Sequence, residues 1–249
     1  MDTKGKNVIV TGGASGFGLE IVKRFCNQGS TVAVLDIDKD KLMTLEENYP
    51  SVFCFTCDVS QADQVVNAIN KIYDQLGDID ILINNAGIMK SAPLVNILER
   101  ENRRHSIELW HQVISVNLDS VFYLTANVSD RMLRSRRKGV IVNVSSIAAR
   151  GNAGQSAYSA SKAGVEALTK VWAKELSPFG IRCAAVAPGF SDTQGTSDAL
   201  EEQMLSRWVS QVPLRRLGTT EEVVDAIFFI IANDFYNGKI LQIDGGLLI

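Results

Sequence analysis

The sequence has few cysteines and no long apolar segment. Its longest apolar run spans residues 226–232, whereas a helix that crosses a bilayer needs about 18 apolar residues. The first residues, 1–6, show neither an apolar nor an Arg-rich leader. Four cysteines in 249 residues are too few for a disulfide-stabilised scaffold. We therefore expect no membrane association and a reducing, cytoplasmic location; a mitochondrial matrix location would need an import signal that is not visible here.

An excess of positive charge is also absent. The chain has 25 Lys and Arg against 28 Asp and Glu, which gives a formal net charge of −3. Proteins that coat nucleic acids are usually strongly basic, so a nucleic-acid partner is disfavoured. Hydrophobic residues make up 46% of the chain, which excludes a disordered or fibrous protein. The length corresponds to one large domain or two small ones, and a small molecule is the expected partner.

One Cys-x-x-Cys pair, Cys54 and Cys57, is the pattern that redox or metal chemistry would use. It lies in a segment that resembles a buried strand, and residues three apart on a strand point to opposite faces. No second such pair exists, and neither histidine is near in sequence. We interpret both thiols as core residues and expect no metal site.

Short apolar runs rich in β-branched residues alternate with longer amphipathic runs along the whole chain. The expected strands are residues 6–11, 31–36, 52–58, 80–85, 139–145, 182–187 and 239–244. The expected helices are residues 16–29, 39–48, 61–75, 109–134, 155–177 and 220–232, with a looser helix-prone region at 197–211. Continuous apolar strands joined by helical crossovers form a parallel sheet covered on both faces. We predict an α/β fold: a single Rossmann-type, doubly wound domain over residues 1–249, with a mostly parallel seven-stranded sheet and helices on both faces.

The first expected strand leads into a glycine-rich turn, Thr11–Gly18, with the sequence TGGASGFG. Glycines allow a tight turn and a close approach of the backbone to a pyrophosphate, and the N-terminus of the next helix favours the anion. The spacing G-x-x-x-G-x-G differs from G-x-G-x-x-G. Its place after the first strand of an alternating pattern is nevertheless that of a dinucleotide-binding turn. A plain strand–helix connection is the alternative.

Asp36 ends the second expected strand. An acidic residue at this position accepts hydrogen bonds from the hydroxyls of an adenosine ribose and repels a 2′-phosphate. No basic residue occupies the glycine turn or directly follows Asp36. The residue therefore favours NAD over NADP. A helix-capping role is the alternative, because Asp38 and Asp40 follow.

Tyr158 and Lys162 are four residues apart in a helix-compatible segment, so they share one helix face. A nearby ammonium lowers the pKa of a tyrosine, which can then exchange a proton with an alcohol oxygen. Ser145 ends the preceding strand, at the sheet edge where ligands bind. Alone, the Tyr–Lys pair would be a surface pair; together with this serine and the glycine turn, it indicates an active site.

These features resemble the short-chain dehydrogenase/reductase family. The matching motifs follow the family's order over almost the whole chain: the glycine turn, Asp58-Val59, Asn84–Gly87, Asn117, Ser145, Tyr158 with Lys162, Pro188-Gly189 followed by Thr193, and Asp244–Gly246. Phe17 departs from the family, which usually has a small aliphatic residue there. The resemblance implies hydride transfer between a nicotinamide cofactor and a secondary alcohol or ketone.

The resemblance also implies a role for each matched position. Tyr158 would be the acid/base, and Ser145 would bind the substrate oxygen. Lys162 would lower the pKa of Tyr158 and hold the nicotinamide ribose, while Asn117 would anchor a water that relays protons. The family spacing to the tyrosine selects Ser145 rather than Ser146. The implied cofactor-binding residues are Gly12, Ser15, Gly16, Phe17, Gly18, Asp36, Asp58, Val59, Asn85, Ala86, Gly87, Tyr158, Lys162, Pro188, Gly189 and Thr193.

The segment between Gly87 and Asn117 is longer than the family leads us to expect, and the excess, Leu98–Ser106, is highly charged. An insertion here is similar to that of the type II 3-hydroxyacyl-CoA dehydrogenases, also known as mitochondrial-type 17β-hydroxysteroid dehydrogenases. In that subgroup Gln155 would also line the substrate site. This resemblance favours a short-chain 3-hydroxyacyl-CoA as substrate. A hydroxysteroid, a polyol or sugar, and a 3-oxoacyl thioester of acyl carrier protein are the alternatives.

Three further expectations concern organisation and partners. Residues 1–145 would mainly bind the cofactor, and residues 146–249 would carry the catalytic helix and the substrate side. Residues 189–214 would form a substrate lid. The family usually forms tetramers, so we expect a homotetramer or a dimer. A non-catalytic, NAD-sensing regulatory protein is the alternative from another functional class, but such proteins typically lose the tyrosine or the lysine.

Overall fold

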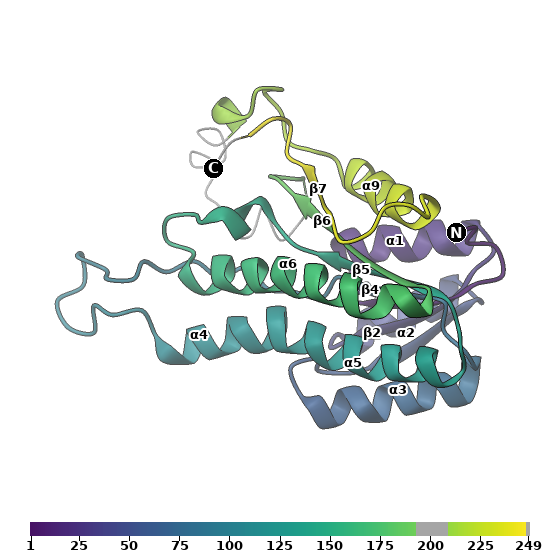
Figure 1. Ribbon diagram of the computed structural model, residues 1–249. Coiled ribbons are helices and arrows are strands. Elements are labelled where there is room, and N and C mark those ends of the chain that lie inside the picture. Colours follow the sequence, from purple (N-terminus) through teal and green to yellow (C-terminus); the bar gives the residue numbers. More distant parts are fainter. Residues whose placement is uncertain (193–208, 248–249) are drawn as a thin grey trace.

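A seven-stranded sheet forms the centre of the molecule (Figure 1). The structure is a computed structural model and describes residues 1–192 and 209–247. The strands are β1 (Asn7–Thr11), β2 (Thr31–Asp36), β3 (Val52–Thr56), β4 (Ile81–Asn84), β5 (Gly139–Val144), β6 (Ile181–Pro188) and β7 (Ile240–Ile243). Their order is β3-β2-β1-β4-β5-β6-β7, and every neighbouring pair is parallel. The predicted α/β fold is confirmed, with a sheet that is parallel throughout rather than mostly parallel.

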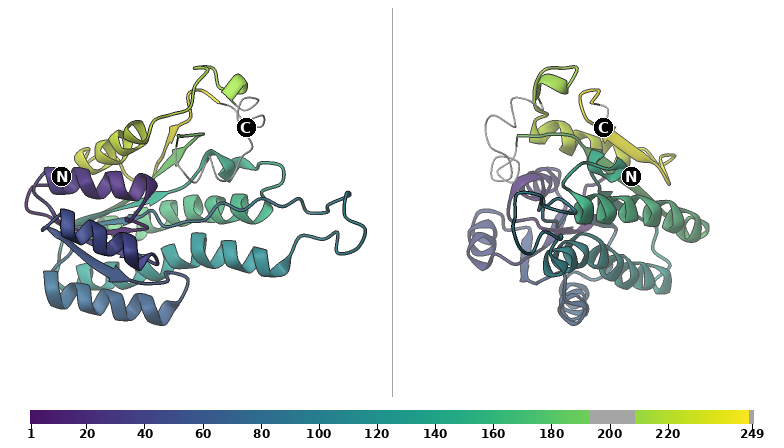
Figure 2. Two further views of the ribbon diagram at one scale, coloured as in Figure 1. Left: turned by 180° about the vertical axis from the view of Figure 1, so that it is seen from behind. Right: turned by 90° about the vertical axis from the view of Figure 1, so that its left-hand side faces the viewer.

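Helices cover both faces of this sheet. Those of regular α-helical geometry are α1 (Gly16–Asn27), α2 (Lys39–Asn48), α3 (Ala62–Leu76), α4 (Ile107–Ile114), α5 (Ser120–Arg134), α6 (Ser156–Leu176) and α9 (Thr220–Ala232). One face is covered by α1, α2 and α9, and the other by α3, α5 and α6 (Figures 1 and 2). The structure is therefore a three-layer sandwich in which the sheet is shielded from water.

The strands form as they do because their apolar side chains alternate between two buried faces. Val8 and Val10 of β1 belong to the apolar cluster beneath α1, α2 and α9, whereas Ile9 belongs to the cluster on the opposite face. All three side chains are fully buried. Burial of a valine or isoleucine side chain stabilises a fold by roughly 1.5–3 kcal/mol. Because β1 gains this burial free energy on both faces, no other register would bury its side chains better.

The two cysteines of the Cys-x-x-Cys pair lie on opposite sides of the sheet. Cys54 packs against the α1/α2/α9 cluster, while Cys57 is part of the cluster beneath α3. Both are free thiols. Burial raises the pKa of Cys54 to about 12 and that of Cys57 to about 11, so neither is a reactive thiolate at neutral pH. The interpretation of these thiols as core residues is confirmed, with Cys54 only partly buried.

The expected helix at residues 109–134 begins earlier and contains an irregular turn. It consists of α4, a π-helical turn at Ser115–Asp119 and α5 in direct succession. A π-helical turn fits an extra residue into a helix and is common at functional sites. The expected region 197–211 falls mostly outside the described residues, although residues 209–211 are helical.

A long excursion precedes α4 and projects away from the body of the molecule (Figure 1). We call residues 88–106 the arm. Its two sides run antiparallel, because Asn96 donates its backbone N–H to Arg103 O at 2.7 Å and His105 donates to Leu94 O at 2.9 Å. The charged insertion that the sequence singles out, Leu98–Ser106, forms the tip and the returning side of this hairpin-like segment.

Candidate active site

The strand order reverses between β1 and β4, where the chain has crossed from one half of the sheet to the other. In doubly wound sheets, ligands bind at this point, outside the carboxyl ends of the strands. The glycine-rich turn follows β1 and the Asn84–Gly87 segment follows β4, so both predicted cofactor segments meet there. The Asn85 side chain joins them, since its Nδ2 donates to Thr11 O at 2.9 Å and to Gly12 O at 3.0 Å.

The glycines of this turn are required by its geometry. Gly12 and Gly16 have φ angles of +62° and +51°, in the left-handed region that other residues rarely adopt. A Cβ at Gly18 would lie only 2.0 Å from Gly12 O. Gly18 therefore lets the first turn of α1 lie directly against the backbone of Gly12.

The N-terminus of α1 is open to an anionic ligand. Ser15 occupies the N-cap position with an extended backbone, its side chain makes no capping hydrogen bond, and the first turn holds no acidic residue. The first backbone N–H groups of a helix need acceptors from outside the helix, and their partial positive charge favours an anion. The turn thus fits the pyrophosphate of a dinucleotide.

A cavity of about 700 Å³ extends from this turn. Ten predicted cofactor residues line it: Gly12, Ser15, Gly16, Phe17, Asp36, Asp58, Val59, Asn85, Ala86 and Gly87. Sequence reasoning missed further residues of its wall, among them Lys41, Ser60, Ile88, Gln112, Ser115 and Val116. No motif marks these residues, because they reach the cavity only through the packing of α2, of α4 with its π-helical turn, and of the loops after β3 and β4. The size of the space and its lining fit a dinucleotide cofactor.

Asp36 lines this cavity at the end of β2. Its Oδ2 accepts a hydrogen bond from the backbone N–H of Ala14 at 3.0 Å, and its Oδ1 accepts one from Asp38 at 3.1 Å. Each carboxylate oxygen keeps a second lone pair for a ligand hydroxyl. The nearest basic side chain of the wall, Lys41, forms an ion pair with Asp38 at 2.8 Å, so its charge is already balanced.

Two predicted cofactor residues lie at the end of β6, outside the wall of this cavity. Pro188 is the last residue of the strand, and Gly189 donates its N–H to Ile243 O at 2.7 Å. A Cβ at Gly189 would lie 2.8 Å from Asp244 Cα, so a glycine lets the ends of β6 and β7 approach closely. Thr193 is outside the described residues.

Tyr158 lies in the first turn of α6 and contacts Ser146 rather than Ser145. Burial raises the pKa of Tyr158 above its usual range, and a hydrogen bond with the Ser146 side chain partly offsets this rise. The sequence predicts that Lys162 lowers this pKa. The Lys162 ammonium lies 5.8 Å from the centroid of the tyrosine ring, and its effect on the phenol stays a prediction.

Lys162 is almost completely buried, with 4% of its surface exposed. Its Nζ donates a hydrogen bond to Val144 O at 2.8 Å. Burial lowers the pKa of Lys162 to about 8. The lysine lies beside Gly87, a residue of the cavity wall, since a Cβ at Gly87 would come within 3.5 Å of its Nζ.

Asn117 is fully buried within the π-helical turn between α4 and α5. Its Oδ1 accepts from Ile88 N at 2.8 Å, and its Nδ2 donates to Ile88 O at 2.9 Å and to Ser161 Oγ at 3.4 Å. A Cβ at Gly87 would lie 3.3 Å from its Oδ1. Asn117 thus anchors the base of the arm beside Lys162, and the described contacts occupy both ends of its amide.

The hydroxyl of Ser145 points away from the tyrosine. It donates to Glu166 Oε1 at 3.1 Å and approaches Lys162 O at 3.4 Å. Ser146, whose Oγ accepts from Ala148 N at 3.2 Å, is the serine on the tyrosine side. The spacing argument that selects Ser145 conflicts with this arrangement, because counting residues does not reveal which way a side chain turns at the end of a strand.

Gln155 joins the arm to the catalytic helix. Its Nε2 donates to Ser91 Oγ at 3.3 Å, and its Oε1 accepts from Asn152 at 3.1 Å. Alongside it, Ala92 donates its N–H to Gly154 O at 2.7 Å. The predicted substrate residue is 8% exposed and lies between the arm and the start of α6.

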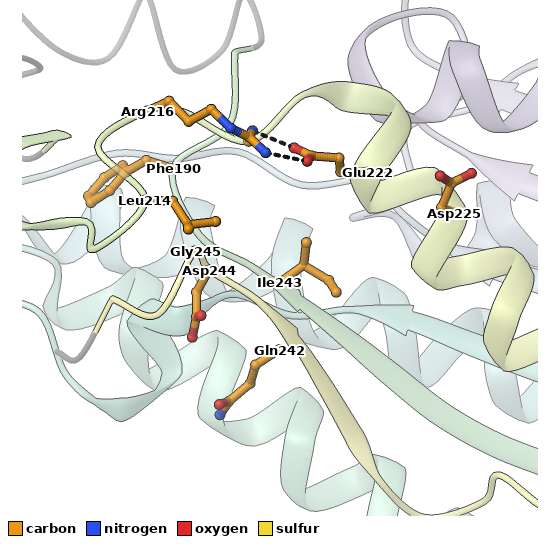
Figure 3. A pocket seen from close by; sticks show the side chains of 10 residues that line it. Phe190, Leu214, Arg216, Glu222, Asp225, Gln242, Ile243, Asp244 and Gly245 are labelled. Carbon is orange, nitrogen blue, oxygen red and sulfur yellow. Dashed lines mark hydrogen bonds and ion pairs between the residues drawn. The ribbon is translucent and has the colours of Figure 1, made fainter.

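A second cavity, of about 390 Å³, lies where β6 and β7 end (Figure 3). Phe190 and Leu214 face it from one side, and Arg216 and Glu222 form a two-bonded ion pair at 2.6 and 2.8 Å across its rim (Figure 3). Phe190 also packs with a small apolar cluster that contains Ile147. This region is the described part of the expected substrate lid; residues 193–208 are not described.

In residues 1–192 and 209–247, no group of three or more His, Cys, Asp or Glu side chains is arranged to hold a metal ion. None of the helices in those ranges has the length and apolar character needed to cross a membrane.

Comparisons with known proteins agree with this geometry. The profile of the family described as short chain dehydrogenase matches residues 6–204. Over 256 aligned positions the chain is 41% identical to a Thermotoga maritima protein named 3-oxoacyl-[acyl-carrier-protein] reductase FabG, with 100% of both chains covered. Proteins of the same name from Chlamydia pneumoniae and Staphylococcus epidermidis are each 37% identical, and the alignments cover 98% and 97% of this chain and 97% and 98% of theirs. The similarity thus includes the glycine turn, the catalytic helix and the C-terminal strand.

Proposed function

The chain belongs to the short-chain dehydrogenase family, whose members are oxidoreductases that interconvert CH–OH and carbonyl groups with a nicotinamide cofactor, and we propose that it reduces a 3-oxoacyl thioester with NADH. The reverse reaction, oxidation of a 3-hydroxyacyl thioester, uses the same groups. The observation that carries the proposal is the buried Lys162, which lies beside Gly87 of the dinucleotide-sized cavity and one helical turn from Tyr158 on α6.

Two independent features support the thioester class. The relatives from three bacteria are named for 3-oxoacyl thioesters of acyl carrier protein. The insertion before α4 is similar to that of the 3-hydroxyacyl-CoA dehydrogenases, which act on the same acyl group attached to CoA. Both lines agree on the reacting carbon and differ only in the carrier. A 3-oxoacyl thioester is therefore the substrate class, and the carrier is settled by the experiment below.

Each residue of the site has a separate role in carbonyl reduction. When bound, the nicotinamide cofactor supplies the hydride. The phenol of Tyr158 gives its proton to the carbonyl oxygen as that oxygen becomes a hydroxyl. The hydroxyl of Ser146 donates a hydrogen bond to the same oxygen and orients it. The positive charge of Lys162 favours the phenolate that Tyr158 leaves behind, and Asn117 holds the segment that forms the wall beside it.

The cofactor preference follows from Asp36. Its carboxylate lines the cavity at the end of β2, where it accepts hydrogen bonds from a ribose diol and repels a 2′-phosphate. Lys41 is close enough to line the same cavity but is paired with Asp38. These features favour NADH, whatever the carrier of the acyl group.

The proposal is tested with the purified protein, NADH or NADPH, and acetoacetyl thioesters of CoA and of acyl carrier protein. We expect oxidation of NADH with at least one carrier, at a kcat/KM more than tenfold above that with NADPH. Tyr158→Phe is expected to lower kcat by about 10²–10⁴-fold, the usual contribution of a general acid, while the Kd for NADH changes less than twofold. Ser146→Ala is expected to lower kcat more than Ser145→Ala does.

Three results would contradict the proposal. Activity with simple secondary alcohols, steroids or sugars and none with either thioester would exclude the substrate class. A preference for NADPH would exclude the role of Asp36. NADH binding without turnover of any carbonyl substrate, and no effect of Tyr158→Phe on a bound regulatory partner, would favour the NAD-sensing alternative.

A further inference from the structure

Three side chains of α6 reach the end of β5 from successive helical turns. Tyr158, Lys162 and Glu166 occupy positions four residues apart, so they form one stripe along the helix. Tyr158 contacts the Ser146 side chain, and Lys162 donates to Val144 O. These two contacts belong to the catalytic machinery described above. The contact of Glu166 is not used by that chemistry and has no role in it so far.

Glu166 holds the residue between these two contacts. The Ser145 hydroxyl donates to Glu166 Oε1 at 3.1 Å, and only 2% of Ser145 is exposed. Its backbone is fixed on the other side, because Ser145 N donates to Val186 O of β6 at 2.8 Å. Among the described residues, no Lys or Arg forms an ion pair with Glu166. The carboxylate thus meets the strand through this serine.

We propose that Glu166 is a positioning residue, which acts through Ser145 to hold Ser146 against the phenol of Tyr158. The inference rests on the proposed function, since it concerns the same site.

Ser145 and Ser146 are adjacent in the chain, so a contact that holds the first also restrains the second. Ser146 is the first residue after the fixed one, and the chain turns there from β5 into the short helix Ile147–Arg150. Without the Glu166 contact, the hydroxyl of Ser145 is a buried donor with the carbonyl of Lys162, at 3.4 Å, as its remaining described acceptor. A buried donor without a good acceptor is costly, so a rotation of the peptide between Ser145 and Ser146 that brings the hydroxyl to a better acceptor becomes favourable. Such a rotation moves Ser146, and displacements of about 1 Å at reacting groups can lower rates by about 100-fold.

The test compares Glu166→Ala, Glu166→Gln, Ser145→Ala and the double variant Ser145→Ala/Glu166→Ala. The glutamine retains an acceptor oxygen, so kcat is expected to stay within about twofold of the wild type. Glu166→Ala is expected to lower kcat about tenfold, with the KM for NADH unchanged. Because the carboxylate acts through one hydroxyl, the double variant is expected to be no slower than Glu166→Ala. Glu175→Ala, an exposed position on the same helix, is the matched control and should match the wild type.

A second measurement does not depend on turnover. The phenolate absorbance of the ligand-free wild type, minus that of Tyr158→Phe, reports the titration of Tyr158. Loss of the Ser146 hydrogen bond removes an effect that lowers the pKa of Tyr158, so Glu166→Ala is expected to shift this titration upward and Glu166→Gln to leave it in place.

Several outcomes would overturn the proposal. Equal losses in Glu166→Gln and Glu166→Ala would show that the hydrogen bond is not what matters. Multiplying losses in the double variant would show that Glu166 acts independently of Ser145. An unchanged Tyr158 titration in Glu166→Ala would show that Ser146 has not moved. If the wild type reduces no thioester, the proposed substrate fails, but the titration still decides the role of Glu166.

Discussion

Lys162 is held in an environment that disfavours its charge. The ammonium is buried beneath β5, and the described contact that offsets its desolvation is the hydrogen bond to Val144 O at 2.8 Å. Burial lowers the pKa of Lys162 from 10.5 to about 8, a difference on the order of 3 kcal/mol at about 1.36 kcal/mol per unit. This free energy opposes folding while the lysine is protonated in both states, and a bound cofactor that accepts from the ammonium would relieve it.

The ligand-free protein is therefore expected to gain stability as the pH rises through this window. Below pH 8 the lysine is charged in both the folded and the unfolded chain, so the full penalty applies. Between pH 8 and 10.5 the unfolded chain binds more protons than the folded one, and stability rises with pH. Relative to Lys162→Met, which has no titrating group there, the wild type should gain on the order of 3 kcal/mol across the window.

The measurement is urea unfolding of both proteins at about pH 7, 8.5 and 10. Subtracting the variant cancels the other groups that titrate in this range. At about pH 7 the methionine variant is expected to be at least as stable as the wild type, although it is inactive. A difference between the two proteins that does not change with pH would show that burial leaves the lysine charged throughout.

At the scale of single residues, the sequence predicts where a residue lies on a helix or strand better than it predicts which way its side chain points. Tyr158 and Lys162 are brought to one face of α6, as the i, i+4 spacing requires. The choice between Ser145 and Ser146 depends on how the chain leaves β5, which a residue count does not contain. Glu166 has no motif at all. Its contact with Ser145 arises because α6 packs against β6 and against the short helix that follows β5, a relation between distant parts of the chain.

At the scale of elements, a partly buried arginine binds the C-terminus of α9, together with the ammonium of Met1, which donates to Ile231 O at 2.8 Å. Arg182 of β6 donates from Nη1 to Ile230 O at 3.0 Å and to Tyr236 O at 2.9 Å, and from Nη2 to Ile231 O at 2.8 Å. The last carbonyls of a helix have no partners within it, and a cation there also complements the helix dipole. Arg182 thus ties the end of α9 to β6.

Arg182→Met keeps the apolar stem but leaves these three carbonyls without their arginine donor. We expect a loss of about 1–3 kcal/mol in the free energy of unfolding, which lowers the Tm by roughly 2–4 °C per kcal/mol in a domain of this size. Arg134→Met is the control. Arg134 also lies in the last turn of a helix, but its side chain is 79% exposed in an ion pair with Asp130, and such pairs contribute about 0–1 kcal/mol. Equal losses in the two variants would contradict the capping argument.

The ends of helices and strands were predictable wherever the apolar periodicity and the residues that flank an element indicate the same boundary. Residues 31–36, 39–48 and 220–232 have the predicted ends, helped by Asp38 and Thr219 as N-caps whose side chains accept from the first turn. The π-helical turn around Asn117 was not predictable, because it is fixed by hydrogen bonds to Ile88 on another segment. The arm was recognisable as an insertion, but its hairpin shape follows from backbone pairing that apolar periodicity does not encode.

At the scale of the molecule, the fold brings cofactor residues together from separate strands. The glycine turn follows β1, Asp36 ends β2, Asp58 follows β3 and Gly87 follows β4. Parallel strands place all these ends at one edge, and the alternation of apolar strands and amphipathic helices is enough to predict that edge. In the unfolded chain these residues are scattered, so a ligand that spans them binds the folded state alone.

Cofactor binding is therefore expected to stabilise the whole domain in one step, and to do so selectively. At a free concentration of 100 times its Kd, a ligand that binds only the folded state raises the free energy of unfolding by about 2.7 kcal/mol. We expect this rise with NADH, seen as a higher urea midpoint with an unchanged slope, and a rise below about 1 kcal/mol with NADPH at the same concentration. Asp36→Asn should bring the two cofactors closer, because it removes the charge that repels a 2′-phosphate. Equal stabilisation by NADH and NADPH in the wild type would mean that Asp36 serves only the backbone of Ala14 and Asp38, to which both its oxygens are bonded in the ligand-free chain.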